Sequence, residues 1–177
     1  GGKTVGRTQK TVRLEANASN ADSQTIRVTS PVLWSVEKPA LYKLVTEIKA
    51  GDKTIDRIET AFGIRSIRFD AVNGFTLNDK KMLLKGGCIH SDNGPLGAAA
   101  IDRAEERKIE LLKKNGYNAI RISHHPPSQP LLDACDRLGM LVLNEAFDMW
   151  NNAKNPQDYH LYFKEWWQKD LNAMILR

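Results

Sequence analysis

The chain has 177 residues, of which 41% are hydrophobic and 27% charged, and its formal net charge is +5 at pH 7. This composition excludes a disordered chain, and the length allows one ordinary domain or two small ones. The basic residues are scattered, which argues against nucleic-acid binding, and no apolar run is long enough to cross a membrane.

Residues 1–69 carry the pattern of an all-β domain. Short stretches that alternate apolar and polar residues are separated by turn formers such as Gly51-Asp52. The predicted strands are 11–14, 24–28, 44–48 and 55–61. Because a free-standing β-sandwich usually needs about seven strands, we expect a sandwich that lacks its amino-terminal strands. Trp34 and Tyr42 are expected to pack in its core or against a neighbouring domain.

From residue 83 to residue 176, strands alternate with helices. A hairpin over 75–84, with its turn at Asn78-Asp79, leads into this region. The predicted buried strands are 83–89, 119–122 and 140–143, and the helical patterns that follow them are 103–115, 128–138 and 157–177. The order β-α-β-α-β-α predicts a parallel sheet with right-handed crossovers. Three such units are less than half of a TIM barrel, so we expect a chain truncated at both ends.

The helical patterns have identifiable caps and apolar faces. Ser128 is expected to cap the second helix, and Gly116 and Gly139 to end the first two. The aromatic residues of the third helix, among them Trp166 and Trp167, are predicted to pack in a core rather than to form a binding site.

Each predicted parallel strand ends in polar side chains. These groups are His90-Ser91-Asp92, Ser123-His124-His125 and Asn144-Glu145. Since the carboxyl ends of parallel strands meet at one edge of a sheet, where α/β enzymes place their chemistry, we predict one site there. Arg121 lies inside an apolar strand and therefore needs a carboxylate or a ligand as its partner. On spacing alone, a structural hydrogen bond explains each histidine as well as a ligand contact does.

Strand-end histidine and acidic side chains can also bind zinc, so a metal-dependent hydrolase is one hypothesis for this site. It is ranked below the two hypotheses given at the end of this section, because the sequence has no His-x-His pair. The two cysteines, Cys88 and Cys135, show no metal-binding spacing and are expected to be buried free thiols.

Six segments, taken together and in order, resemble glycoside hydrolase family 2, and most closely its β-galactosidase-like members. They are Phe62–Arg65, Gly74–Asn78, Leu84–Gly94, Arg121–Pro127, Cys135–Glu145 and Phe147–Trp150. The resemblance covers nearly the whole chain. It implies a multidomain β plus α/β fold, with part of an immunoglobulin-like β-sandwich over 1–66 and the first three βα units of a TIM (β/α)8 barrel over 67–177.

The same resemblance implies that the catalytic residues lie outside this chain. Retaining glycosidases need two carboxyl groups roughly 5–5.5 Å apart. In this family both are glutamates, at the ends of the fourth and seventh barrel strands. Glu145 lies one strand too early to be the acid/base, so the chain by itself is expected to be inactive.

The remaining roles are carried over by position. Arg121 would hydrogen-bond the nucleophilic carboxylate and keep it ionised, and Glu145 would support the site by pairing with Arg121 or by holding a sugar hydroxyl. The residues expected to contact substrate are His90, Asp92, His124, Asn144, Glu145 and Trp150, the last by stacking on a sugar ring. His125 is expected to be structural.

The sequence also departs from the family pattern. Ser91 stands where relatives often have histidine, and Asn144 where they often have aspartate. The Glu-x-His pair that binds magnesium in some members has no counterpart after Glu145, so we expect no metal and no other cofactor.

The preferred hypothesis is a retaining exo-β-glycosidase that hydrolyses terminal β-galactosides by double displacement. The alternatives are β-glucuronidase-like or β-mannosidase-like specificity, and a non-catalytic carbohydrate-binding or structural module that ends naturally at Arg177. The expected partner is a carbohydrate, with no nucleic acid and no membrane. The sequence leaves open whether the parent protein is a homo-oligomer, and whether it is periplasmic or secreted.

Overall fold

The computed structural model describes residues 2–176. The chain divides into two compact units, one ending at Val32 and the other beginning at Leu33. Among the described residues of the first unit there is no helix and no strand, so the strands predicted over 11–14 and 24–28 are wrong for this structure. The reason is physical, because alternating residues make a strand only where a second strand supplies hydrogen-bond partners.

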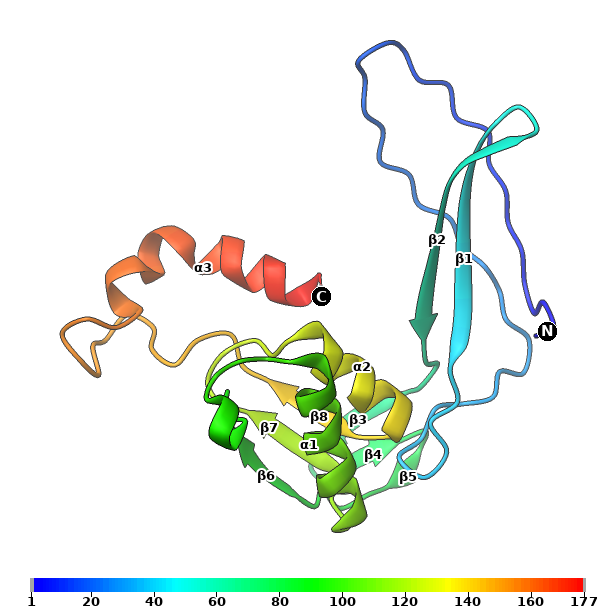
Figure 1. Cartoon of the computed structure of the whole chain (residues 1–177). Coiled ribbons are helices and arrows are strands. Elements are labelled where there is room, and N and C mark those ends of the chain that lie inside the picture. Colours follow the sequence, from blue (N-terminus) through cyan, green and yellow to red (C-terminus); the bar gives the residue numbers. More distant parts are fainter. Residues whose placement is uncertain (1, 177) are drawn as a thin grey trace. The chain divides into compact units, whose positions relative to one another are not determined.

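The second unit begins with an antiparallel hairpin. Strand β1 (Tyr42–Ala50) pairs with β2 (Lys53–Phe62), and Gly51 turns the chain with a φ of +61° (Figure 1). Both strands contain the stretches predicted from alternation. The aromatic rings of Tyr42 and Phe62 stack at a centroid distance of 5.7 Å at the open end of the hairpin, away from its turn.

A small antiparallel sheet of three strands follows. Its members are β3 (Ile67–Asp70), β4 (Gly74–Leu77) and β5 (Lys80–Lys81). Asn78 and Asp79 form the turn between β4 and β5 with φ values of 53° and 62°, the left-handed conformations that a tight hairpin turn requires. The predicted hairpin and its turn are therefore confirmed, whereas β3 was not predicted.

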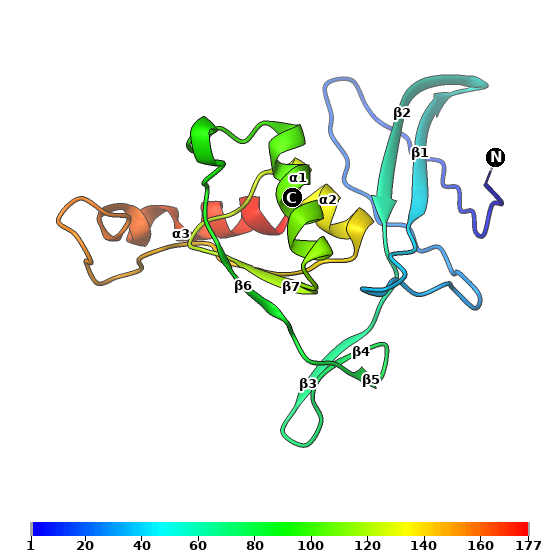
Figure 2. The ribbon, with the colours of Figure 1, turned by 60° about the horizontal axis from the view of Figure 1, so that its bottom comes forward.

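The third sheet is parallel, with the order β6-β7-β8. Its strands and the helices that follow them are β6 (Gly86–Ile89), α1 (Asp102–Lys114), β7 (Ala119–Ile122), α2 (Gln129–Leu138), β8 (Leu141–Asn144) and α3 (His160–Ile175), with a short 3-10 turn, η1 (Gly94–Leu96), before α1. Figure 2 shows α1 and α2 on the same face of this sheet. This arrangement confirms the predicted βα order.

The main core lies between the sheet and these two helices. It consists of Ile109, Ile120, Ile122, Leu131, Ala134, Cys135 and Met140. Close approach of β6 to β7 depends on Gly86, because a Cβ there would lie 2.0 Å from the carbonyl oxygen of Ala119. Burial raises the pKa of the Cys135 thiol to about 12, and the predicted burial of this cysteine is confirmed.

A second core cluster surrounds Trp34, which is 1% exposed. Val36, Leu77 and Leu141 pack with it. The indole Nε1 donates to the carbonyl oxygen of Asp136 at 2.7 Å. The predicted packing role of Trp34 is confirmed, and the cluster joins the chain before β1 to the small antiparallel sheet and to β8.

Several expectations about burial are wrong. The strand predicted from residue 83 begins only at Gly86, and Cys88 is exposed rather than buried. Trp166 and Trp167 are exposed, and no described residue of α3 is buried. Ser128 occupies the N-cap position of α2 but makes no side-chain capping hydrogen bond. Apolar residues are buried only where a second surface faces them, and sequence periodicity does not supply that surface.

Over residues 2–176, no helix is both long and apolar enough to span a membrane.

Candidate functional site

The parallel register places the three strand ends at one level of the sheet. Ile89 of β6 pairs with Ile122 of β7, which pairs in turn with Asn144 of β8. The polar residues predicted to form one site follow these positions directly. Their convergence therefore results from short strands of equal length that end together.

Glu145 is held by two side chains from the neighbouring strand end. The Arg121 Nε donates to Glu145 Oε1, and the His124 Nδ1 lies 2.7 Å from Glu145 Oε2. Because an ionised carboxylate only accepts hydrogen bonds, Nδ1 of His124 carries the proton in this contact. The partner that Arg121 requires is thus Glu145.

The charges of this cluster favour an ionised carboxylate. The hydrogen bond from Arg121, and after it the one from His124, lowers the pKa of Glu145 below its usual range. Glu145 in turn raises the pKa of the Arg121 guanidinium. A carboxylate that is ionised and held in this way is suited to accepting hydrogen bonds and not to donating a proton.

Cys88 lies beside Arg121 on the adjacent strand, where the register pairs the two residues. The Arg121 Nη1 is 3.4 Å from Cys88 Sγ. The Ser123 hydroxyl and the Arg121 guanidinium both favour the thiolate and lower the pKa of Cys88. This contact was not predictable from the sequence, since it depends on strand register.

The second nitrogen of the His124 ring faces another carboxylate. Nε2 of His124 lies 3.9 Å from Asp148 Oδ1, and the Lys154 Nζ lies 3.2 Å from the same oxygen. No role was predicted for Asp148 or Lys154 from the sequence. The available signal was an aspartate close to Glu145 and Trp150 in the segment that follows β8.

The remaining predicted contacts differ in how they are placed. The ring of His90 meets that of His124 edge to face at 5.9 Å. Asp92 Oδ1 accepts a hydrogen bond from the Gly94 backbone at 2.8 Å, within its own turn.

Asn144 Oδ1 is buried and has no hydrogen-bond partner among the described residues. A buried acceptor without a donor is costly, and an oxygen this inaccessible is suited to a buried water molecule rather than to a sugar hydroxyl.

Trp150 presents an open aromatic face. Its side chain is 64% exposed, and its ring is parallel to that of Phe163 at a centroid distance of 6.1 Å. Stacking on Phe163 supports the indole from one side. The arrangement is the one expected of a platform for the C–H face of a sugar ring.

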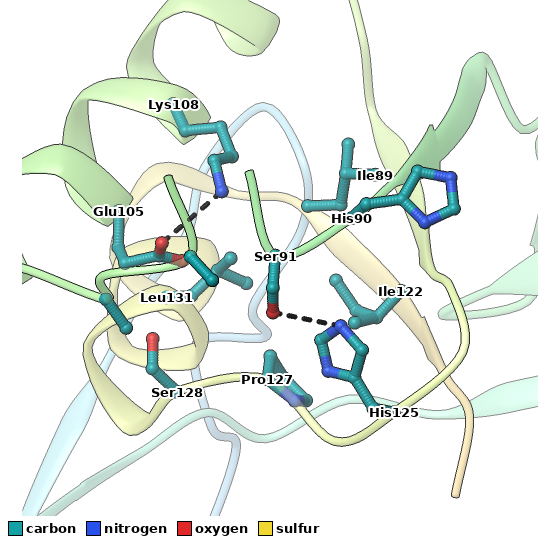
Figure 3. A pocket seen from close by; sticks show the side chains of 12 residues that line it. Ile89, His90, Ser91, Glu105, Lys108, Ile122, His125, Pro127, Ser128 and Leu131 are labelled. Carbon is teal, nitrogen blue, oxygen red and sulfur yellow. Dashed lines mark hydrogen bonds and ion pairs between the residues drawn. The ribbon is translucent and has the colours of Figure 1, made fainter. Parts of the chain in front are cut away.

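His125 takes part in a different, local network. Its Nε2 lies 2.9 Å from the Ser91 hydroxyl (Figure 3). Its Nδ1 contacts the carbonyl oxygen of Pro126. A cavity of about 30 Å³ adjoins this pair, and the buried Glu105 lines it. This space holds about one water molecule and not a sugar. The network therefore fits a structural role for His125.

Side chains that could bind a metal do not gather at one point in the described part of the chain. Over residues 2–176, no group of three or more histidine, cysteine, aspartate or glutamate side chains is placed to hold an ion. At the strand ends, Glu145 is instead engaged by Arg121 and His124.

Comparison with protein families gives two matches. The model described as "Glycosyl hydrolases family 2" matches residues 1–65, and that of the family's TIM barrel domain matches residues 70–166. The chain belongs to glycoside hydrolase family 2. The predicted resemblance is confirmed, and so is the fold class, a family β domain followed by the start of a TIM barrel. The boundary at 66/67 stays a prediction.

Relatives within the family carry two kinds of name. The β-galactosidase BoGH2A of Bacteroides ovatus is 45% identical over 99% of this chain, which covers 21% of that protein. A protein of Formosa agariphila named putative β-glucuronidase is 42% identical over 92% of the chain, which covers 16% of it. The chain thus spans about a fifth or less of the length of these relatives.

Solved structures agree with the family assignment. A family 2 member from Bacteroides cellulosilyticus is 57% identical, with a TM-score of 0.81, over 85% of this chain and 19% of that chain. A β-glycosidase from Bacteroides vulgatus is 41% identical, with a TM-score of 0.80, over 84% of this chain and 19% of that one.

Proposed function

We propose that this family 2 chain is part of a retaining exo-β-glycosidase that removes terminal β-galactosides by double displacement, and that its strand ends form part of the wall facing the sugar. The observation that carries the proposal is the cluster of Arg121, His124 and Glu145 at the carboxyl ends of parallel strands. This edge is where barrel enzymes place their chemistry.

Arg121 is suited to holding the nucleophile of such a reaction. A guanidinium has five N–H donors, and Arg121 uses Nε for Glu145. Nη1 contacts Cys88 Sγ, and the remaining N–H donors can serve a second carboxylate, which the positive charge would keep ionised and therefore nucleophilic. The two catalytic glutamates are expected from a part of the protein outside this chain, so the chain alone is expected to be inactive.

The polar and aromatic groups around the cluster suit a sugar. Trp150 offers an exposed ring face for stacking. Hydrogen-bond groups for hydroxyls are supplied by His90, Asp92, His124, Asn144 and Glu145. A mixture of one apolar face and several polar groups is typical of sites that orient a small polar ligand.

The charges favour a neutral sugar over a uronic acid. Arg121 and Lys154, the two strongly basic side chains at the strand ends described above, each face a carboxylate already. Asp148 neutralises Lys154, and Arg121 is the cation proposed above to hold the nucleophile, so neither is left for a substrate carboxylate. A β-glucuronide is the second candidate, supported by 42% identity to the putative β-glucuronidase of Formosa agariphila.

The test is hydrolysis of nitrophenyl β-galactoside, β-glucuronide and β-mannoside by the full-length product of the gene that encodes this chain. We expect the galactoside to have the highest kcat/KM, and NMR to show release of the β-anomer first. Preference for the glucuronide would replace the galactoside assignment, and no hydrolysis of any substrate would leave a carbohydrate-binding or structural module as the better hypothesis.

The isolated 177-residue chain is the matched control. We expect it to hydrolyse none of the three substrates. Turnover of the galactoside by this chain, abolished by Glu145→Gln, would instead make Glu145 a catalytic residue.

A further inference from the structure

The His124 ring lies between two carboxylates that follow β8. Glu145 Oε2 is 2.7 Å from Nδ1, and Asp148 Oδ1 is 3.9 Å from Nε2. The Nδ1 contact fixes both the orientation of the ring and the proton on that nitrogen. Nε2 is therefore presented in a defined direction, beside Asp148.

The separation of 3.9 Å between His124 Nε2 and Asp148 Oδ1 is suited to one bridging atom. It is too long for a direct hydrogen bond, but one oxygen atom can lie about 2.8 Å from both atoms at once. A hydroxyl group fits this position because its single proton can be donated to the carboxylate while its oxygen accepts from an N–H at Nε2. A carboxylate from a ligand does not fit, since it would be repelled by Asp148.

Asp148 is held in place by charge. The Lys154 Nζ lies 3.2 Å from its Oδ1 and 3.5 Å from its Oδ2. Lys154 is itself fixed through its backbone, because its N–H and that of Asn155 both donate to Asp158 Oδ2 at 2.7 Å. These hydrogen bonds, together with that from the His160 N–H, lower the pKa of Asp158 and keep it an acceptor. The segment after β8 is thus pre-organised before α3 begins.

The same segment carries Trp150, whose open face is the candidate platform for a sugar ring. A hydroxyl acceptor and a stacking surface therefore lie two residues apart in the sequence. In ligand-binding pockets, an aromatic surface commonly provides contact area, and a few fixed polar groups provide specificity.

We propose that Asp148 is a specificity-determining residue, and that its carboxylate and Nε2 of His124 share one hydroxyl of the terminal sugar. The proposal rests on the proposed glycosidase function and adds a residue to it. Lys154 then acts as a positioning residue, since it contacts Asp148 and acts only through it.

The test uses the full-length gene product with Asp148→Ala, Asp148→Asn and Lys154→Met, and with Asp52→Ala as a control at an exposed turn. Kinetics are measured on nitrophenyl β-galactoside and on its monodeoxy derivatives. A charge-assisted hydrogen bond predicts a loss of about tenfold to a hundredfold in kcat/KM for Asp148→Ala. We expect smaller losses for Asp148→Asn and Lys154→Met, and none for Asp52→Ala.

The deoxy series separates recognition from a merely structural effect. For one derivative, removal of the hydroxyl should cost the wild type about as much as Asp148→Ala does, and should cost that variant less than about twofold. Unchanged kcat/KM in Asp148→Ala would overturn the proposal. So would a loss that is the same for the parent and every deoxy substrate, in either the alanine or the asparagine variant. A wild-type enzyme with no glycosidase activity would instead refute the proposed function, and this assignment with it.

Discussion

The Nε of Arg121 on β7 donates to Oε1 of Glu145, which directly follows β8. The positive charge of an arginine within a strand and the negative charge of a strand-end carboxylate therefore neutralise each other. The two residues are 24 positions apart in the sequence. Their contact is possible because β7 and β8 are parallel neighbours with Arg121 opposite Leu143. This pair is the electrostatic centre of the candidate site.

The first prediction concerns acid stability. The pKa of Glu145 is lower in the folded state than its ordinary value of 4.5, chiefly through Arg121. The stabilisation by this carboxylate is therefore present above about pH 4.5 and is lost as the pH falls through the folded pKa. Glu145→Gln should reduce the free energy of unfolding at pH 7. Between pH 5 and 3, that free energy should decrease less in the variant than in the wild type. Urea denaturation at each pH measures both effects. Glu165→Gln on the exposed side of α3 is the control, and an unaltered pH dependence in Glu145→Gln would contradict the prediction.

The second prediction concerns the core cluster around Trp34. Removing this buried ring should destabilise the protein by about 3–5 kcal/mol in Trp34→Ala, because a large cavity replaces it. Trp34→Phe keeps most of the volume but loses the hydrogen bond to the carbonyl oxygen of Asp136, so it should cost less. Urea denaturation followed by circular dichroism measures both, and equal losses in the two variants would show that the hydrogen bond and not the packing dominates.

The third prediction compares two glycines with similar backbone conformations. Gly51 and Gly139 have φ values of +61° and +78°, but only Gly139 is crowded, since a Cβ there would lie 2.3 Å from the carbonyl oxygen of Val36. Gly51→Ala should cost about 1–2 kcal/mol for the left-handed backbone alone. Gly139→Ala should cost clearly more, because the backbone of Val36 must also move. Thermal denaturation of both variants provides the comparison, and equal losses would rule out the steric contribution.

The fourth prediction concerns the cysteines. Cys88 is exposed and its thiol pKa is lowered, whereas burial raises the pKa of Cys135 to about 12. A thiol reagent such as DTNB should therefore modify Cys88 rapidly in the native 177-residue chain and Cys135 only after unfolding. Peptide mapping assigns the modified residue, and Cys88→Ser removes the fast phase if the assignment is correct. Arg121→Met should slow that phase, since the guanidinium favours the thiolate.

Local patterns in the sequence were sufficient for much of the fold. The helix from Asp102 to Lys114, the left-handed Gly139 after α2, and the turn at Asn78-Asp79 all follow from spacing, capping and backbone preference. The convergence of Arg121, His124 and Glu145 was also predictable, because parallel strands of equal length end at one edge. The family resemblance supplied the roles that spacing alone left open.

Only the tertiary structure decided which side chains meet and which are buried. Cys88 belongs to an apolar stretch, yet it is exposed because no second surface covers it in the described chain. The alternating residues over 11–14 and 24–28 form no strands, since ladder hydrogen bonds require a partner. Asp148 lies 3.9 Å from His124 because the segments that carry them follow two parallel neighbouring strands, β7 and β8. Periodicity and capping are properties of neighbouring residues, whereas burial and pairing depend on distant ones, and a single sequence does not specify those contacts directly.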